Sequence, residues 1–597
     1  MDYYGFYTGK ILDAYEYLGC HFTEDGAVFR TFAPAAVHIS VIGEFNNWSE
    51  EPMHKVYDGN FWECTIPNVQ QGMKYKYRIY RRDGMFIDHA DPYGFRMELP
   101  PDSASITWRM NNYQWNDCQW MKKRSDCRKG ALNIYEVHLG SWKKKAENAW
   151  YSYAEIAEPL ISYVKENGYN YIELMPIAEH PCDNSWGYQQ TGFYSPTARY
   201  GTPDELRFFI DYAHQNNVGV ILDFVPVHFA VDGYALTEYD GTALYEYPHS
   251  DVGSNEWGSR NFNHSRGEVQ SFLQSCACYW LKEFHFDGLR IDALSNMIYW
   301  QGNKQRGMNE RAVGFIRHMN ASLKAMDSSI MLIAEDSTAY EGVTRPADKG
   351  GLGFDYKWDM GWMNDTLSYF QTHPYDRKKD YHKLTFSMMY FGSENFLMPF
   401  SHDEVVHGKA TILQKMHGQY EEKFPQARAL YMYMYAHPGK KLNFMGNEIG
   451  QLREWDEKRE QDWDIVKYPI HHSFSRYMKD LCMIYQNNPA LYEWDYEKEG
   501  FEWIDCHQED KCIYVFERRS KKQRILVIFN FSDKDQIYKL AVKDADCLEL
   551  MIASDNEIYG GSGKYPAKTV LKLEEGGADV EVSAFTGFMY AIRQFSA

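Results

Sequence analysis

An arginine and an aspartate stand two residues apart in the segment FDGLRIDA, residues 286–293, where a short apolar run ends. Such a run is typical of a buried strand, so Arg290 and Asp292 are expected at its tip. The permanent charge of Arg290 would keep the Asp292 carboxylate ionised, which is the state that a nucleophile requires. We therefore identify Asp292 as the first candidate nucleophile. The same two residues could instead form a structural ion pair at a strand end.

Further polar residues follow other apolar runs at equivalent positions. They are Asp223 and His228 near the third run, Glu335 at the fifth, and His402 with Asp403 at the seventh. Glu335 follows the apolar residues MLIA, so burial and neighbouring negative charge could raise its pKa into the range of a general acid and base. Cleavage of a glycosidic bond requires one carboxylate that stays ionised and a second that stays protonated. Alternatively, because the chain contains 83 Asp and Glu residues, several of them could follow apolar runs by chance.

Eight short apolar runs, most of them separated by a plausible helix, would position these side chains. Helices are predicted over residues 155–166, 203–216, 269–284 and 313–326. This alternation predicts a parallel sheet closed into a (β/α)8 barrel, in which the carboxyl ends of the strands carry the chemistry. A doubly wound open sheet is the competing fold. The eight runs span residues 132–140, 171–177, 218–225, 286–293, 330–337, 354–360, 396–403 and 441–448.

Alternating patterns occur on both sides of the predicted barrel. Before it, the runs AVFRTFA, VHISVIGEF, FWECTIP and YKYRIYR predict a small β-sandwich, and after it, CIYVFERR, RILVIFNFS, TVLKLEE and FTGFMYAIR predict a second one. Residues 227–266 are too many for a routine strand-to-helix connection, so we expect an excursion over the barrel mouth that shapes a cleft. The predicted domains are an N-terminal β-sandwich over residues 1–115, a catalytic barrel over 116–490 and a C-terminal β-sandwich over 491–597.

Composition narrows the class of ligand. The net charge of -20 argues against a nucleic-acid partner or an anionic membrane, because phosphate binding needs clustered Lys and Arg. Aromatic residues make up 16% of the chain, and their flat apolar faces suit sugar rings, although core packing must account for most of them. Eleven Cys without metal-ligand spacing predict a reduced, cytoplasmic protein, and no apolar run reaches the length of a membrane span. We expect a monomer or a weak homo-oligomer.

The segments LDFVPVHF, GLRIDA, IAEDS and FSHDE, in this order and spacing, resemble the four signature segments of the α-amylase superfamily of glycosidases and transglycosidases. The resemblance spans the predicted barrel. It implies that Asp292 is the nucleophile, Glu335 the general acid and base, and Asp403 the residue that binds and distorts the sugar at the cleavage point. The substrate-binding residues that it implies are Tyr188, which would stack on the sugar, His228, Arg290 and His402, together with Asp223 as a structural partner of Arg290.

Longer segments resemble a subgroup of this superfamily, the bacterial-type 1,4-α-glucan branching enzymes. They are residues 185–206, 400–409 and 441–455, and VIGEFNNW at 41–48 agrees with a glycan-binding-like N-terminal sandwich. The resemblance implies retaining cleavage of an internal bond of an α-1,4-glucan such as glycogen or amylose, and transfer of the chain to a 6-hydroxyl, without a cofactor. An amylase- or debranching-type hydrolase with the same carboxylates is the alternative. An inactive glucan-binding protein is another.

Two residues depart from the patterns of these families. Val227 stands where general amylases usually carry an Asn that binds a structural calcium, and valine cannot ligate calcium, so no metal is expected. Asp336 stands where branching enzymes usually carry a second Glu, which puts the positioning of the acceptor in question. The three carboxylates themselves are all present. If they act in a retaining reaction, the carboxyl groups of Asp292 and Glu335 should lie about 5 to 5.5 Å apart.

Overall fold

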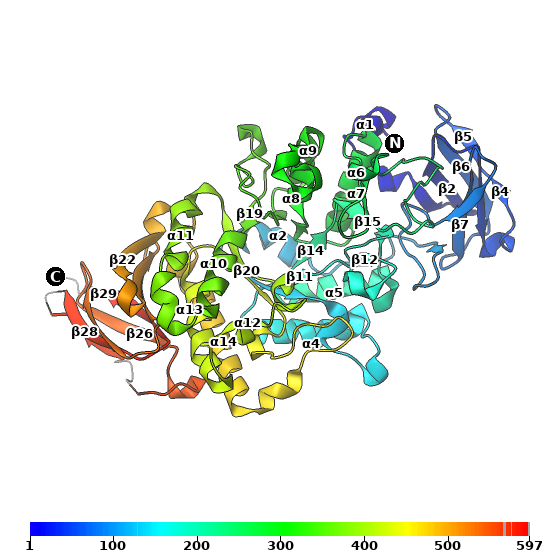
Figure 1. The fold of residues 1–597 in the computed structure, drawn as a ribbon. Helices are drawn as coiled ribbons and strands as arrows, with labels where there is room; N and C mark the ends of the chain where they lie inside the picture. The colour runs from blue at the N-terminus through cyan, green and yellow to red at the C-terminus, as the bar shows by residue number, and fades with distance from the viewer. Residues whose placement is uncertain (128, 565–568, 575, 595–597) are drawn as a thin grey trace. The chain divides into compact units, whose positions relative to one another are not determined.

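The computed structural model describes residues 1–127, 129–564, 569–574 and 576–594 (Figure 1). The chain divides into two compact units. The first contains Met1–Lys122, His138–Pro159 and Glu173–Asp355, and the second contains Lys123–Val137, Leu160–Ile172 and Tyr356–Ala597. None of the helices in the described ranges combines the length and the apolar character that crossing a bilayer demands.

Within the described ranges, eight parallel strands follow one another in chain order around a closed barrel. This arrangement confirms the predicted (β/α)8 fold and excludes the open sheet. Every residue of the eight strands is buried, as expected for strands that are covered on both faces. The strands are β10 (Asn133–Val137), β11 (Tyr171–Leu174), β14 (Gly219–Phe224), β17 (Gly288–Ile291), β18 (Met331–Ala334), β19 (Tyr356–Trp358), β20 (Phe396–Phe400) and β21 (Lys440–Phe444).

The register of β14, β17 and β18 in the first unit sets the positions of the candidate residues. Asp223 on β14 lies opposite Arg290 on β17. Ile291 on β17 lies opposite Ala334 on β18. Asp292 and Glu335 are the next residues of these two strands, so the two carboxylates leave neighbouring strands at the same level.

The four predicted helices are present, with ends that differ from the predictions by up to three residues. They are α4 (Tyr153–Glu166), α5 (Pro203–Gln215), α7 (Gly267–Glu283) and α9 (Glu310–Met326). Helix α5 begins with a capping box in which Thr202 and Glu205 each accept a hydrogen bond from the other's backbone N–H, and Pro203 occupies the first turn. These signals fix its start, because they satisfy N–H groups that have no partner inside the helix.

The N-terminal region of the first unit is a β-sandwich, as predicted. One sheet contains β1 (Gly19–Phe22), β2 (Gly26–Phe32), β6 (Phe61–Pro67) and β5 (His54–Val56), and the other contains β4 (Glu51–Pro52), β3 (His38–Gly43), β7 (Lys74–Tyr80), β8 (Phe86–His89) and β9 (Ser105–Ile106). Trp62 and Tyr75 are buried in its core. Helix α1 (Tyr3–Tyr7) packs against α7 within the same unit (Figure 1).

The predicted excursion at residues 227–266 contains little regular structure. Strand β15 (His228–Phe229) pairs with β16 (Arg260–Asn261) in an antiparallel ladder, and the short helix α6 (Ser250–Gly253) lies between them in the chain (Figure 1). His228 therefore belongs to a short hairpin-like ladder rather than to a barrel strand. Its side chain is buried.

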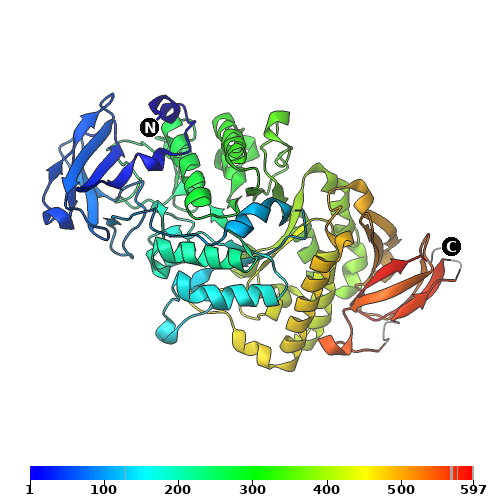
Figure 2. The ribbon, with the colours of Figure 1, turned by 180° about the vertical axis from the view of Figure 1, so that it is seen from behind.

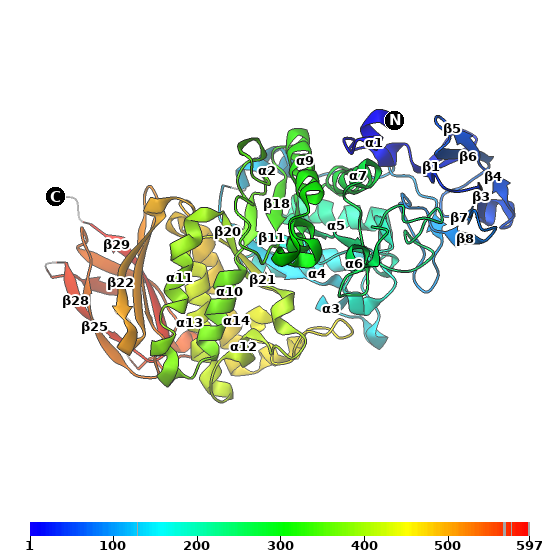
Figure 3. The ribbon, with the colours of Figure 1, turned by 45° about the horizontal axis from the view of Figure 1, so that its top comes forward.

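The C-terminal region of the second unit is also a β-sandwich. One sheet contains β22 (Phe501–Gln508), β23 (Ile513–Arg519), β24 (Arg524–Asn530), β29 (Thr586–Arg593), β26 (Cys547–Ala553) and β27 (Val570–Lys572), and β25 (Gln536–Ala541) pairs with β28 (Gly577–Val582). Helix α13 (Tyr420–Ala436) packs against β29 and against α14 (Pro469–Asn487). Figure 3 labels these three elements, and Figure 2 shows the C-terminal strands, in orange and red, from behind. Glu575, the last residue of the predicted run TVLKLEE, lies outside the described residues.

Candidate active site

The guanidinium group of Arg290 is the centre of a buried contact network in the first unit. Its Nη1 atom donates to both carboxylate oxygens of Asp223, at 2.7 Å each, and to Oδ1 of Asp292 at 2.8 Å. The hydroxyl of Tyr188 donates to Oδ2 of Asp223 at 2.6 Å. The structure thus brings together four of the predicted residues. Asp223 acts as the predicted partner of Arg290, because both of its oxygens are engaged away from solvent.

Glu335 approaches the same guanidinium from the neighbouring strand. Its Oε2 atom lies 3.6 Å from Nη2 of Arg290 and accepts a 2.7 Å hydrogen bond from the backbone N–H of Ala293. Burial raises the pKa of Glu335 from its ordinary 4.5 to about 7, and the negative charge of Asp292 acts in the same direction, while Arg290 opposes the rise. This carboxyl group can therefore both give and accept a proton near neutral pH, as the sequence predicts.

The contacts distinguish the two oxygens of each carboxylate. Arg290 engages Oδ1 of Asp292, so Oδ2 is the atom available for attack on a substrate carbon. The backbone N–H of Ala293 engages Oε2 of Glu335, so Oε1 is the oxygen that can carry the acid proton. The pair can thus present one nucleophilic oxygen and one acidic O–H group.

His228 and Trp257 extend the first unit's site along the excursion. The two rings lie 5.2 Å apart between centroids and are tilted by 42°. Burial lowers the pKa of His228 to about 4, and the charge of Asp292 opposes this only in part, so the imidazole is neutral at pH 7. Its Nδ1 atom is buried without a hydrogen-bond partner among the described residues. A neutral imidazole can accept a hydrogen bond from a sugar hydroxyl or donate one to it.

Asp403 and His402 belong to the second unit, where they follow strand β20. Nδ1 of His402 lies 2.5 Å from Oε1 of Glu136 on strand β10, and the backbone N–H of His402 donates to Oε2 of Glu136 at 2.9 Å. Nζ of Lys409 donates to Oδ2 of Asp403 at 2.8 Å. Although burial alone would raise the pKa of Asp403, the Lys409 ammonium holds it below its ordinary value. Asp403 is therefore ionised at neutral pH.

A buried lysine organises the loop that carries Asp403. Nζ of Lys415 donates to the backbone carbonyls of Glu404, Lys409 and Ala410 at 2.5, 2.7 and 2.5 Å. Glu454 holds the same loop by accepting hydrogen bonds from the backbone N–H groups of Gly408 and Ala410. These contacts are needed because His407, Gly408 and Ala410 all have positive φ angles, which non-glycine residues rarely adopt.

Sequence reasoning missed Lys415, Glu136 and Trp257. Lys415 left no signal in the side-chain pattern, because its partners are backbone carbonyls of the preceding loop. Glu136 left none because its partner, His402, lies 266 positions later in the chain. Trp257 had a detectable signal, since a lone Trp in the polar segment SNEWGSRN is unusual for a loop. Its side chain is 42% exposed beside His228, where a flat ring can pack on a sugar.

The two residues that depart from the patterns of the family, Val227 and Asp336, are both buried. Val227 is a buried core residue. The Asp336 carboxylate is also buried and accepts hydrogen bonds from the backbone N–H and the hydroxyl of Thr338, so it stabilises a local turn. Among the residues that the structure describes, no group of three or more His, Cys, Asp or Glu side chains could hold a metal ion.

Three stretches of the chain match known families. Residues 17–94 match carbohydrate-binding module 48 (isoamylase N-terminal domain), residues 154–241 match the alpha amylase catalytic domain, and residues 503–592 match the alpha amylase C-terminal all-beta domain. Among solved structures, a putative alpha amylase from Salmonella typhimurium is 16% identical, with a TM-score of 0.73 and coverage of 97% of this chain and 100% of that one. A pullulanase from Anoxybacillus sp. LM18-11 complexed with maltotetraose is 15% identical, with a TM-score of 0.75 and coverage of 99% and 89%. These two likenesses show the fold alone.

Curated relatives are similar along nearly the whole chain. The 1,4-alpha-glucan branching enzyme GlgB of Fusobacterium nucleatum is 46% identical, covering 94% of this chain and 93% of the relative. The proteins of the same name from Bacillus cereus (strain AH187) and Bacillus caldolyticus are 44% and 43% identical, each covering 96% of this chain, and 90% and 88% of the relative. The chain therefore belongs to the family of bacterial 1,4-alpha-glucan branching enzymes within the α-amylase superfamily.

Proposed function

We propose that this protein is a 1,4-α-glucan branching enzyme. It cleaves an internal α-1,4 bond of a glucan such as glycogen or amylose and transfers the released chain to the 6-hydroxyl of a glucose unit, forming an α-1,6 branch. One observation carries the proposal: a single guanidinium group contacts two carboxylates on neighbouring strands, of which one is ion-paired and the other has a pKa of about 7. Two such carboxylates are the requirement for retaining glycosidic chemistry.

In the first step, Oδ2 of Asp292 attacks the anomeric carbon of the donor. The C1–O4 bond breaks, and the O–H at Oε1 of Glu335 gives its proton to the departing O4, so the shortened chain leaves as a neutral alcohol. The donor chain is then held on the enzyme as an ester of Asp292. The shared contact with Arg290 supports the close approach of the two carboxyl groups that a retaining pair needs, about 5 to 5.5 Å.

In the second step, the ionised Glu335 removes the proton from the 6-hydroxyl of an acceptor glucose. That oxygen attacks C1 from the face opposite the Asp292 ester, which the departing chain has vacated, and the bond between C1 and Oδ2 breaks to return the Asp292 carboxylate. Two displacements on the same carbon retain the configuration. A pKa of about 7 suits a group that must give a proton in one step and take it back in the next.

The other predicted residues take supporting roles in this proposal. From the resemblance to the α-amylase superfamily, we assign Asp403 and His402, which follow β20, to the subsite at which the bond is cleaved. There, ionised Asp403 would bind two hydroxyls of the distorted sugar, and His402 and neutral His228 would bind further hydroxyls. Tyr188, whose hydroxyl is held by Asp223, would present its ring face to the sugar.

A branching assay on linear amylose tests the function. A branching enzyme produces new α-1,6 linkages, detected by proton NMR, with little gain in reducing ends, because each cleaved bond is replaced by a new glycosidic bond. Reducing ends that accumulate without α-1,6 linkages would assign the chain to the hydrolases. Inactivity of both the wild-type protein and Asp292→Asn, with glucan binding intact, would favour an inert glucan-binding protein.

Several further predictions complete the proposal. We infer a cytoplasmic location, which is supported by the free thiols of ten described cysteines. We also retain the domain boundaries near residues 115 and 490, a monomeric or weakly oligomeric state, and the absence of a nucleic-acid partner or a cofactor as predictions. A sedimentation measurement would check the oligomeric state.

A further inference from the structure

A pocket of about 660 Å3 lies in the C-terminal β-sandwich of the second unit, and the chemistry above does not use it. Three segments line it: the connection between β23 and β24, the connection between β25 and β26, and the C-terminal end of β29. Strands β23, β24 and β29 are neighbours in one sheet, which brings these segments together. The volume is within the range of ordinary small-molecule sites.

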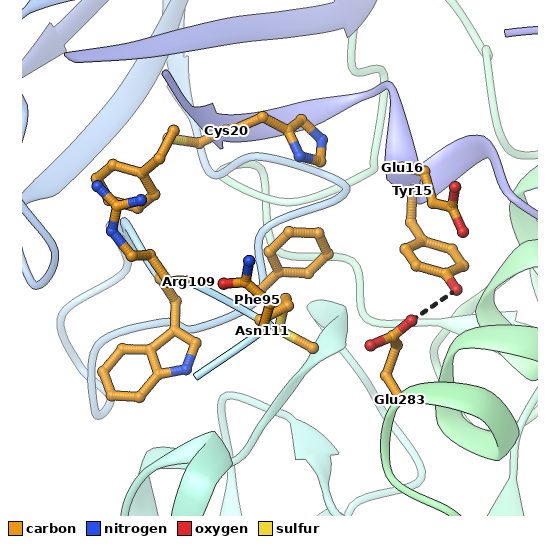
Figure 4. Close-up of a pocket in the computed structure, with 11 residues that line it drawn as sticks. Tyr15, Glu16, Cys20, Phe95, Arg109, Asn111 and Glu283 are labelled. Atoms are coloured by element: carbon orange, nitrogen blue, oxygen red, sulfur yellow. Dashed lines mark hydrogen bonds between the residues drawn. The ribbon is translucent and has the colours of Figure 1, made fainter. Parts of the chain in front are cut away.

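Positive charge dominates the wall of this pocket, although the whole chain carries a net charge of -20. The described lining residues include six cations and one carboxylate, that of Asp544. The six cations are Arg519, Lys521, Lys522, Arg524, Lys543 and Arg593. A pocket of about 480 Å3 in the first unit has the opposite balance, because Glu16 and Glu283 line it together with Arg109 (Figure 4). The cationic wall is therefore a local feature of the C-terminal sandwich.

Glutamates neutralise only part of this charge. Each of the three arginines in the wall pairs with at least one glutamate. The pairs are Arg519 with Glu502 and Glu517, Arg524 with Glu517, and Arg593 with Glu549. Two arginines thus share the buried carboxylate of Glu517. Together with Asp544, the three glutamates offset four of the six positive charges, so an excess of two remains.

The lysines carry this excess. Lys521 and Lys522 stand in the connection between β23 and β24, and Lys543 stands in the connection between β25 and β26. All three are exposed, and none of their ammonium groups forms an ion pair within the described ranges. Ammonium groups without an anionic partner in the protein are available to an anion from solution.

Hydrogen bonds hold both connections in place before a ligand arrives. Nη1 of Arg524 donates to the backbone carbonyl of Asp544 at 2.9 Å, and Nη2 donates to the backbone carbonyl of Lys543 at 3.1 Å. On the other connection, Nε2 of Gln523 donates to Oδ1 of Asn488 at 2.6 Å. Because the backbone that carries the lysines is already ordered, a ligand pays less conformational entropy on binding.

These features restrict the class of ligand. None of the described lining residues is aromatic, so the pocket offers no ring on which a nucleic-acid base could stack. A neutral sugar would take water from the cations without supplying a charge in return. A phosphoryl group carries up to about two negative charges and several acceptor oxygens, which suit both arginine and lysine. A small ligand with two such groups would offset the excess charge.

We propose that this pocket binds a small ligand with two phosphoryl groups, either inorganic pyrophosphate or a sugar bisphosphate. The phosphoryl oxygens are the feature that both ligands share, and Lys521, Lys522 and Lys543 are their principal donors. The proposal is independent of the branching reaction, because that reaction uses none of these residues. A ligand that binds only the folded protein also stabilises it, so saturation of the pocket raises the unfolding temperature.

Calorimetric titration of the full-length protein tests the site. Pyrophosphate, in a buffer of constant ionic strength without divalent cations, should bind at one saturable site. Lys522→Gln and Lys543→Gln should each raise its Kd roughly three- to tenfold, because each removes one exposed charged contact. Lys511→Gln is the matched control and should bind like wild type, because Lys511 is an exposed lysine that precedes β23, at the opposite end of that strand from the pocket. Equal Kd values in the three variants would overturn the proposal.

Titration with glucose 1,6-bisphosphate distinguishes the two sources of phosphoryl groups. If it binds the pocket more tightly than pyrophosphate does, the sugar contributes to recognition. An equal or weaker affinity shows that the phosphoryl groups suffice. If neither compound binds the wild-type protein at a saturable site, the proposal is wrong.

A chemical footprint of the wild-type protein gives a second test that needs no variant. Saturating pyrophosphate should slow the acetylation of Lys522 and Lys543 by acetic anhydride, measured by mass spectrometry of peptides, and should leave the acetylation of Lys511 unchanged. Equal slowing at all three lysines, or slowing at none of them, would contradict binding in this pocket.

Discussion

The backbone N–H of Ala293 donates a 2.7 Å hydrogen bond to Oε2 of Glu335. Ala293 directly follows Asp292 and adopts a left-handed conformation, with a φ of 44°, that costs about 1 to 2 kcal/mol in a residue other than glycine. The turn that ends β17 thus links the candidate nucleophile to the candidate acid. The hydrogen bond engages one oxygen of Glu335 and leaves the other to carry the proton.

The protonation of Glu335 should limit the rate at alkaline pH. Its pKa is raised from 4.5 to about 7, so kcat/KM should fall as the pH rises through 7. Glu335→Gln should lower kcat about 10²- to 10⁴-fold, and Glu341→Gln, an exposed glutamate nearby in the chain, should leave the profile unchanged. The unfolded chain ionises Glu335 near its ordinary pKa of 4.5, whereas the folded protein does so only at about 7. The free energy of unfolding therefore falls as the pH rises from 4.5 to 7, and Glu335→Gln should be more stable than wild type at pH 8. If kcat/KM of Glu335→Gln still falls above pH 7 as it does in the wild-type protein, Glu335 is not the general acid.

Asp292 and Asp223 share Arg290 but should respond differently to substitution. Asp292→Asn should reduce turnover of amylose about 10³-fold or more with glucan binding and stability largely intact, because it removes the nucleophile. Asp223→Asn should lower the free energy of unfolding by about 3 to 5 kcal/mol, because it leaves the buried Arg290 without its principal counter-ion. Chemical unfolding curves and amylose turnover measure the two effects. Equal losses of stability in both variants would refute this division of roles.

The contacts of Lys415 predict a positioning role. Burial lowers its pKa from 10.5 to about 8, with Glu404, Glu454 and Lys409 as the neighbouring charges. Lys415→Met should raise KM about tenfold, because three carbonyls of the loop that presents Asp403 lose their donor, and Lys415→Arg should restore part of the affinity.

The pH dependence of stability distinguishes this role from simple packing. Between pH 8 and 10.5, the unfolded chain keeps the proton of Lys415 and the folded protein has lost it, so stability rises with pH in this window. The difference in unfolding free energy between wild type and Lys415→Met should therefore grow as the pH rises from 8 to 10.5. A constant difference would show that Lys415 titrates normally.

The exposed ring of Trp257 should contribute to substrate binding. Trp257→Ala should raise the KM for amylose about tenfold with little change in kcat, and Trp257→Phe should retain most of the affinity, because a flat ring remains beside His228. Phe208→Ala on helix α5 is the control, since Phe208 has the same 42% exposure. Steady-state kinetics that show equal changes in Trp257→Ala and Phe208→Ala would exclude a role for Trp257.

The sequence alone was sufficient to predict the barrel and to place Asp292 and Glu335 at the ends of its strands. The eight apolar runs correspond to β10, β11, β14, β17, β18, β19, β20 and β21, because strands buried on both faces must be apolar throughout. The positions of Asp292 and Glu335 also followed from local pattern, since each is the first residue after its strand. The resemblance to the α-amylase superfamily implied the pairing of Asp223 with Arg290, and the two residues lie opposite each other on adjacent strands.

Only the tertiary structure decided which oxygen of each carboxylate is engaged and which groups hold the functional loops. Ala293 reaches Glu335 through an unusual backbone angle, Glu136 reaches His402 from a strand 266 positions earlier in the chain, and Lys415 binds backbone carbonyls. Contacts to the main chain leave no pattern in side-chain types, and contacts between distant segments depend on strand register. Sequence periodicity therefore determines which elements form, whereas the hydrogen bonds that set protonation and geometry depend on how those elements meet.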